Sequence, residues 1–126
     1  MFLLDSDVVI WLTRGRRPEI ASLVGNLRTQ GPLGISVLTR FQVLSGMRPW
    51  ESSSTLSLLD ALDTFEVTAG VADLAAEFWR RYRVQGKTLE PIDTMIAATA
   101  VLENLMLVTL NVRDFPMPEV RLYGRD

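Results

Sequence analysis

The sequence contains no cysteine and no histidine among its 126 residues. Without them it has no thiol nucleophile, no Ser-His-Asp triad, no imidazole base and no zinc site of the usual nitrogen and sulfur ligands. Any metal chemistry must therefore use oxygen ligands, which suit hard cations such as Mg²⁺ or Mn²⁺. The exclusion of disulfides also fits a reducing compartment.

Long apolar runs and an excess of positive charge are missing as well. No stretch approaches the roughly 20 residues that a membrane-spanning helix needs, and no basic segment followed by a signal-like apolar stretch opens the chain. We therefore expect a cytoplasmic protein that does not enter a membrane. The net charge of −2 gives no global basic footprint of the kind that simple nucleic-acid binders carry.

What is present is ordinary globular material, with 48% hydrophobic and 22% charged residues. The length predicts a single domain over residues 1–126. Apolar runs of strand length alternate with segments of helical periodicity. These runs lie at residues 2–4, 33–38, 65–67, 105–110 and 120–123. The alternation predicts an α/β fold, a three-layer α/β/α sandwich with a mainly parallel central sheet.

Two helix boundaries are predicted from local chemistry. The capping box Thr39-Arg40-Phe41-Gln42 predicts a helix that begins directly after the strand over residues 33–38. Gly46, Pro49 and the serines at residues 52–54 predict a break in the chain, followed by a helix over residues 55–64. Both boundaries depend on short polar side chains, which favour helix caps and turns.

Three acidic residues occupy comparable places. Asp5 follows the first strand, Asp93 lies in the opening turn of a helix that starts at Glu90-Pro91, and Asp114 follows the strand over residues 105–110. Strand carboxyl ends and helix amino ends share one edge of a parallel sheet, so these acids are expected to meet. Each also has a purely structural interpretation. Asp5-Ser6-Asp7 can cap a helix, Asp93 can favour a helix dipole, and Asp114 can form a turn.

Four segments carry a resemblance to a known family. L-L-D-S-D-V-V-I, I-S-V-L-T-R-F-Q-V-L-S-G, D-T-M-I-A-A-T-A and L-V-T-L-N-V-R-D-F resemble the signature blocks of PIN-domain ribonucleases, in the size and order of VapC toxins. The resemblance implies a metal-dependent endoribonuclease toxin of a toxin–antitoxin pair, in which clustered carboxylates hold Mg²⁺ or Mn²⁺ and water cleaves an RNA phosphodiester. It also implies a VapB-type antitoxin as partner and a homodimer. We expect the dimer and antitoxin contacts on apolar helices around Trp11, Leu44, Met47 and Trp50.

The resemblance assigns site residues block by block. The catalytic positions fall on Asp5, Gln42, Asp93 and Asp114, the metal ligands on Asp5, Asp93 and Asp114, and supporting roles on Asp7, Thr109 and Asn111. Gln42 departs from the family, which carries Glu three residues after the Thr. An amide oxygen without charge should weaken both metal affinity and the activation of water.

Two departures from the family leave alternatives open. Gln42 is either a natural variant or a substitution introduced to silence a toxic nuclease. Asp7, where the family usually carries Asn, either restores a fourth carboxylate near the site or only caps the first helix. The second functional hypothesis is accordingly a non-catalytic PIN-like module that binds RNA or a partner protein.

Basic residues outside the four blocks are candidates for RNA contact. They are Arg14, Arg80, Arg83 and Lys87. Solvated helix faces are an equally good explanation for each of them. A phospho-acceptor receiver, a third class with an acid pair after its first strand, is excluded because no Asp follows the third strand and Lys87 is the only lysine.

Overall fold

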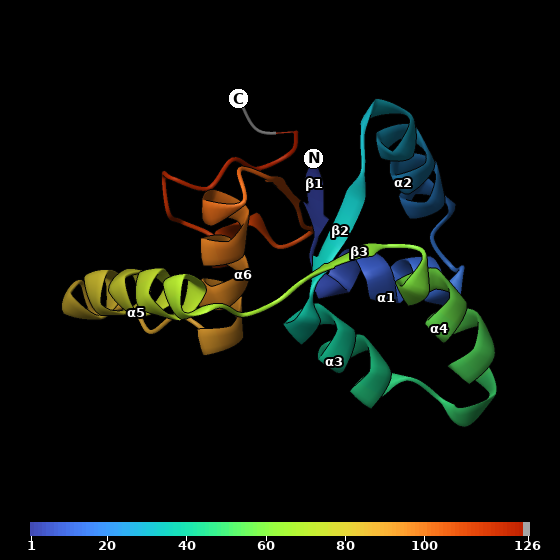
Figure 1. Ribbon diagram of the computed structural model, residues 1–126, viewed down its shortest axis with the longest axis horizontal. Coiled ribbons are helices and arrows are strands. Elements are labelled where there is room, and N and C mark those ends of the chain that lie inside the picture. Colours follow the sequence, from blue (N-terminus) through green and yellow to red (C-terminus); the bar gives the residue numbers. More distant parts are fainter. Residues whose placement is uncertain (125–126) are drawn as a thin grey trace.

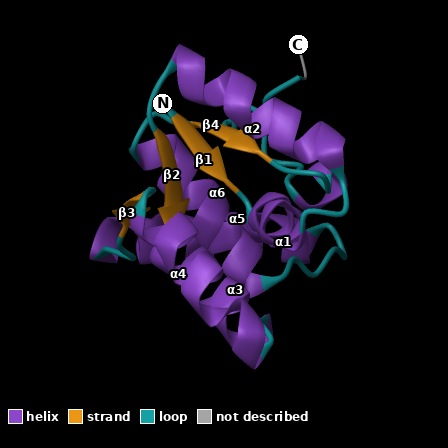
Figure 2. Cartoon of the chain, turned by 90° about the vertical axis from the view of Figure 1, so that its right-hand side faces the viewer, coloured by secondary structure: helices purple, strands orange, loops and turns teal. Residues whose placement is uncertain are grey.

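The computed structural model describes residues 1–124 and is built around a four-stranded sheet in the order β3-β2-β1-β4. The strands are β1 (Phe2–Leu4), β2 (Leu33–Ser36), β3 (Asp63–Phe65) and β4 (Met106–Val108). All three pairings are parallel, so every strand ends at the same edge. Figure 2 shows β1 and β2 running toward the side of the molecule where α1 and α3 lie.

Helices cover both faces of the sheet (Figure 1). One side carries α1 (Ser6–Arg14), α2 (Pro18–Gln30), α3 (Val37–Gly46) and α4 (Ser52–Asp60), and the other carries α5 (Ala69–Val84) and α6 (Pro91–Leu102). Because successive strand residues point to opposite faces, Leu3 packs with α5 and α6, whereas Phe2 and Leu4 pack with α1, α2 and α4. The predicted three-layer α/β/α sandwich with a parallel sheet is confirmed.

Two predicted helix boundaries are wrong. The capping box at Thr39 does not open a helix, because the Ser36 hydroxyl already accepts a hydrogen bond from the Leu38 amide at 3.1 Å and α3 begins at Val37. The strand before it is therefore two residues shorter than expected. The predicted break does occur after Gly46, where α3 ends, but it does not extend to Ser52, because the short 3₁₀ helix η1 (Pro49–Glu51) leads directly into α4.

The segment after β4 packs along the edge of the sheet without forming the strand predicted over residues 120–123. It forms a single parallel bridge, in which the Leu107 amide donates to the Arg121 carbonyl at 2.8 Å and the Tyr123 amide donates to the Leu107 carbonyl at 2.9 Å. Earlier in the segment, the 3₁₀ helix η2 (Val112–Asp114) follows β4 closely. No helix within residues 1–124 combines the length and apolar character needed to cross a membrane.

Candidate active site

Asp5 lies at the carboxyl end of β1 and is almost completely buried, with 5% of its surface exposed. It is the N-cap of α1, because its Oδ1 accepts a hydrogen bond from the Ser6 amide at 2.8 Å. Its Oδ2 accepts a hydrogen bond from the Thr109 hydroxyl, also at 2.8 Å. The register of the sheet explains this contact, since Leu4 pairs with Val108 and the next residue of each strand follows at the same edge.

Asp7 connects the first turn of α1 to the loop after β4. Its Oδ1 accepts from the Val8 amide at 2.7 Å, while its Oδ2 accepts from the Leu110 amide at 3.0 Å and from Nδ2 of Asn111 at 3.1 Å. Asp7 is therefore not the helix cap, which is Asp5. The predicted supporting residues Thr109 and Asn111 both belong to this hydrogen-bonded loop.

Asp93 and Asp114 bring two more carboxylates to this edge. Asp93 lies in the first turn of α6 and Asp114 in η2. Burial, together with the nearby charges of Asp5 and Asp114, raises the pKa of Asp93 to about 7. Burial likewise raises the pKa of Asp5 to about 6, with the nearby charge of Asp7 as the next cause. Four carboxylates from three segments therefore lie within electrostatic range of one another.

The donor set suits a hard cation, although the acids do not yet form a finished coordination shell. All the donors are oxygen atoms, and a cation would relieve the repulsion that raises the pKa of Asp5 and Asp93. Within residues 1–124, however, no three acidic side chains lie close enough together to hold one ion. The chemistry of the residues fits Mg²⁺ or Mn²⁺, and binding would have to draw the carboxylates closer.

Gln42 lies on α3 with its side chain partly buried. Its Oε1 is buried without a hydrogen-bond partner, as is Oγ1 of Thr39 one turn earlier. A buried acceptor of this kind costs about 1–3 kcal/mol when it stays unpaired. None of the side-chain hydrogen bonds within residues 1–124 joins Gln42 to the acids. The amide oxygen is thus unpaired but shielded from solvent, a feature that the sequence does not reveal.

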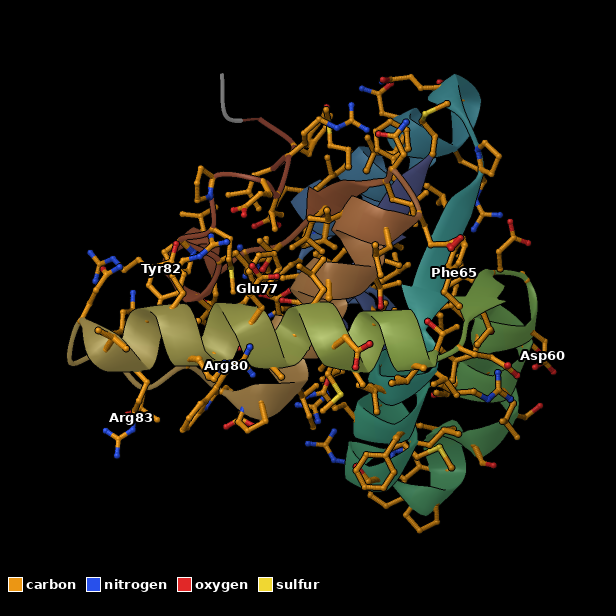
Figure 3. The ribbon with its side chains drawn as sticks, turned by 60° about the vertical axis from the view of Figure 1, so that its left-hand side comes forward. Asp60, Phe65, Glu77, Arg80, Tyr82 and Arg83 are labelled. Atoms are coloured by element: carbon orange, nitrogen blue, oxygen red, sulfur yellow. The ribbon has the colours of Figure 1, made fainter. Side chains whose placement is uncertain are left out.

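The four basic candidates do not gather at one place. Arg14 ends α1, on the far end of that helix from Asp5. Arg80 lines a groove between α5 and α6. Arg83 lies against the Trp79 ring at 5.8 Å and projects from α5 on the opposite side from Tyr82 (Figure 3). Lys87 instead lines a cavity together with two arginines that sequence analysis did not single out.

These two arginines are Arg113 and Arg121. Arg113 could have been noticed from its position beside Asp114 in the fourth signature block. Arg121 carries no sequence signal, because only the folding of the C-terminal segment along β4 brings it near Lys87.

Comparisons with known proteins agree with this geometry. The family described as PIN domain matches residues 2–117. Ribonuclease VapC10 of Mycobacterium tuberculosis is 40% identical over 119 residues, which cover 94% of this chain and 89% of that protein. Ribonuclease VapC19 of the same species is 34% identical over 118 residues, covering 93% and 94% respectively. A toxin-antitoxin complex from Klebsiella pneumoniae contains a chain that superposes with a TM-score of 0.78 at 26% identity, covering 95% of both chains.

Proposed function

The chain belongs to the PIN domain family, and we propose that it is an RNA-cleaving toxin of a toxin–antitoxin pair. Relatives that match over nearly the whole chain are named ribonucleases, and a structural neighbour is a toxin-antitoxin complex. The observation that carries the proposal is the group of carboxylates at the carboxyl edge of the sheet, in which Asp5 is buried and Asp93 half-buried. Burial and mutual repulsion raise the pKa of Asp93 and Asp5 there, which is typical of sites built for chemistry.

Mg²⁺ or Mn²⁺ is the cofactor of this proposal, held by Asp5, Asp93 and Asp114. When bound, such a cation polarises the phosphodiester and makes water more acidic. The chain itself keeps the acids in place. The Thr109 hydroxyl and the Ser6 amide fix both oxygens of Asp5. Asp7 acts beside them as a positioning residue, because it holds the loop that contains Asn111.

The proposed partners are an RNA substrate and an antitoxin of the VapB type. An antitoxin would inhibit the nuclease by covering the acidic edge of the sheet. Its gene would be expressed together with the gene of the toxin. A gene for a small DNA-binding protein directly upstream would support this pairing.

Gln42 also supports a second candidate, a non-catalytic PIN-like module that binds RNA or protein. A neutral amide at the usual position of the second acid lowers the negative charge available to a cation. The module would keep the fold and the surface of the nuclease while lacking its activity.

The substitution Gln42→Glu separates the two candidates. It adds a charged oxygen ligand with little change in size, so we expect cleavage of cellular RNA with Mn²⁺ to appear or to rise by at least about tenfold, the effect of about 1.4 kcal/mol on the barrier. Chelator should abolish the cleavage, and Asp114→Asn in the same background should lower it. The measurement is the rate at which purified, metal-loaded protein cuts RNA into fragments.

The matched control for this experiment is Gln30→Glu. Gln30 is an exposed residue at the end of α2, so the same chemical change there should leave cleavage at the parent level. A Gln42→Glu protein that is folded, as judged by circular dichroism, and cuts no RNA in the presence of Mn²⁺ would reject the nuclease in favour of the binding module.

A further inference from the structure

A cavity of about 900 Å³ lies between the loop after α5 and the segment that follows β4. Lys87, Arg113 and Arg121 line it, and none of the lining residues within the described part of the chain is acidic. Three positive charges around one cavity stand out in a protein whose net charge is −2. Such a focus of one sign of charge attracts an anion.

The fold holds the guanidinium of Arg121 directly, and it anchors the backbone of Lys87. Nη2 of Arg121 donates to the Asn104 carbonyl at 3.1 Å and to Asn104 Oδ1 at 3.2 Å. Since a guanidinium has five N–H donors, the others stay available to a ligand. The Lys87 amide donates to the Tyr82 carbonyl at 2.9 Å, which holds the loop after α5 against that helix. An anion that binds here would meet a guanidinium that already has a defined position, which reduces the entropy lost on binding.

The wall of the cavity is also anchored. Phe115 and Met117 are buried in the core with α5 and α6, and the Tyr82 hydroxyl donates to the Pro116 carbonyl at 3.0 Å. Figure 3 shows Tyr82 pointing from α5 toward this segment. Val112, Pro116 and Pro118 add apolar surface to the lining. The cavity thus offers both cations and an apolar wall, the combination that single-stranded nucleic acids use through their phosphates and bases.

The cavity adjoins the acidic site through η2. Arg113 lines the cavity, and the next residue, Asp114, is one of the four acids. The cavity and the acidic site therefore share this 3₁₀ helix. An acidic protein segment could also bind these cations. The carboxylates of the adjoining site would repel it, whereas the phosphodiester of an RNA could bind there together with a metal ion.

We propose that this cavity binds the single-stranded RNA beside the bond to be cleaved, with Lys87, Arg113 and Arg121 neutralising its phosphates. The identity of the ligand as RNA rests on the proposed function. The volume lies in the usual range of ligand pockets, about 300–1,000 Å³, and accommodates at least one nucleotide. Specificity for an RNA sequence or loop would then depend on the residues that line this cavity.

The test measures the affinity of the full chain for a fluorescent single-stranded RNA oligonucleotide by anisotropy, in the presence of chelator and over a series of salt concentrations. The variants are Lys87→Gln, Arg113→Gln and Arg121→Gln, singly and combined. Each should weaken binding and lower the slope of log Kd against log salt by about 0.7, the value for one phosphate contact on a single strand. Arg28→Gln, an exposed position on α2, is the matched control and should change neither quantity.

Three results would overturn the inference. The first is a triple variant with the parent's affinity and salt slope. The second is a parent chain that binds no RNA under these conditions. The third is a polyglutamate peptide that competes as strongly as RNA and loses its effect in the same variants, which would assign the cavity to an acidic protein segment.

Cleavage separates this inference from the proposed function. If the triple variant loses RNA binding while Gln42→Glu cuts no RNA, the cavity remains an RNA site and the nuclease is rejected. If Gln42→Glu cuts RNA and adding the triple substitution leaves kcat/KM unchanged, the nuclease remains and the cavity is rejected.

Discussion

Asp93 is partly buried and also lies close to other carboxylates. Burial raises its pKa to about 7, and burial raises that of Asp5 to about 6, whereas each carboxyl titrates near 3.8 in the unfolded chain. The native protein therefore binds protons more tightly than the unfolded chain between about pH 4 and 7. Over that range the free energy of unfolding falls as pH rises. We expect the metal-free protein to melt at a lower temperature at pH 8 than at pH 5.

Calorimetry or circular dichroism in chelator measures this effect. Asp93→Asn should flatten the pH dependence and raise the midpoint at pH 8, whereas Asp73→Asn, an exposed acid on α5, should leave the profile unchanged. Mg²⁺ or Mn²⁺ should raise the midpoint of the parent at pH 8, because a ligand that binds only the native state stabilises it. A parent midpoint that climbs steadily from pH 5 to 8 without metal would contradict this account.

At the residue scale, the sequence was sufficient to expect the acidic residues near one another, but not the hydrogen bonds around them. Asp5 and Asp93 could be expected together because one follows a strand and the other opens a helix, and Asp114 because it lies in the loop after a strand, positions that share an edge in a parallel sheet. The hydrogen bonds from Asp7 to Leu110 and Asn111 could not be found, because they depend on how the loop after β4 folds back. The position of Arg121 in the cavity lining could not be found either, because it also depends on how the segment after β4 folds back.

At the scale of elements, Gly34 sets how closely β2 and β3 approach. A Cβ atom placed on Gly34 would lie 2.5 Å from Cε2 of Phe65 and 3.2 Å from the Asp63 carbonyl oxygen, so the strand pair leaves no room for it. Phe65 lies beside β2 in Figure 3. Gly34→Ala should therefore destabilise the protein by about 1–3 kcal/mol, the usual cost of overpacking.

A double-mutant cycle tests this explanation by urea unfolding. Phe65→Leu in the Gly34→Ala background should recover part of the loss, because the shorter side chain makes space for the new methyl group. Gly25→Ala is the matched control, since its added Cβ would meet nothing within 4 Å on α2. If Gly34→Ala lowers the free energy of unfolding equally in the parent and in the Phe65→Leu background, the Phe65 ring is not the cause of the loss.

Apart from the strand expected over residues 120–123, which is only a bridge, the main helices and strands were predicted in the right order and type, while their ends were not. The alternation of apolar strands with periodic helices was sufficient to predict the three layers, because a sheet covered by helices on both faces buries the apolar side of each element. Helix ends depend on which polar side chain reaches a free amide first. Ser36 caps α3 before Thr39 can, and the Glu51 carboxylate accepts from the Arg48 amide at 2.7 Å, which starts η1 and α4 earlier than the serines suggested. Such competition cannot be settled from spacing alone.

At the scale of the whole molecule, two large aromatic side chains remain exposed. On α3 and η1, Phe41 is 63% exposed and Trp50 is 78% exposed, in a chain that buries most of its other large apolar residues. The other expected contact residues are more covered. Trp11 lies under the Arg17 guanidinium at 5.3 Å, and Leu44 and Met47 are partly buried. Exposed aromatic side chains are enriched at protein interfaces.

We therefore keep the expectation of a homodimer and assign its contacts to Phe41 and Trp50. Light scattering with the purified chain at micromolar concentration should report twice the monomer mass of 14.1 kDa. Phe41→Glu with Trp50→Glu should shift the protein to a monomer, because two charges would have to be buried without partners in the interface. Val84→Glu is the control, since Val84 is 88% exposed at the end of α5 and lies outside α3 and η1. A parent that stays monomeric across the micromolar range would exclude the dimer and leave these two side chains for an antitoxin.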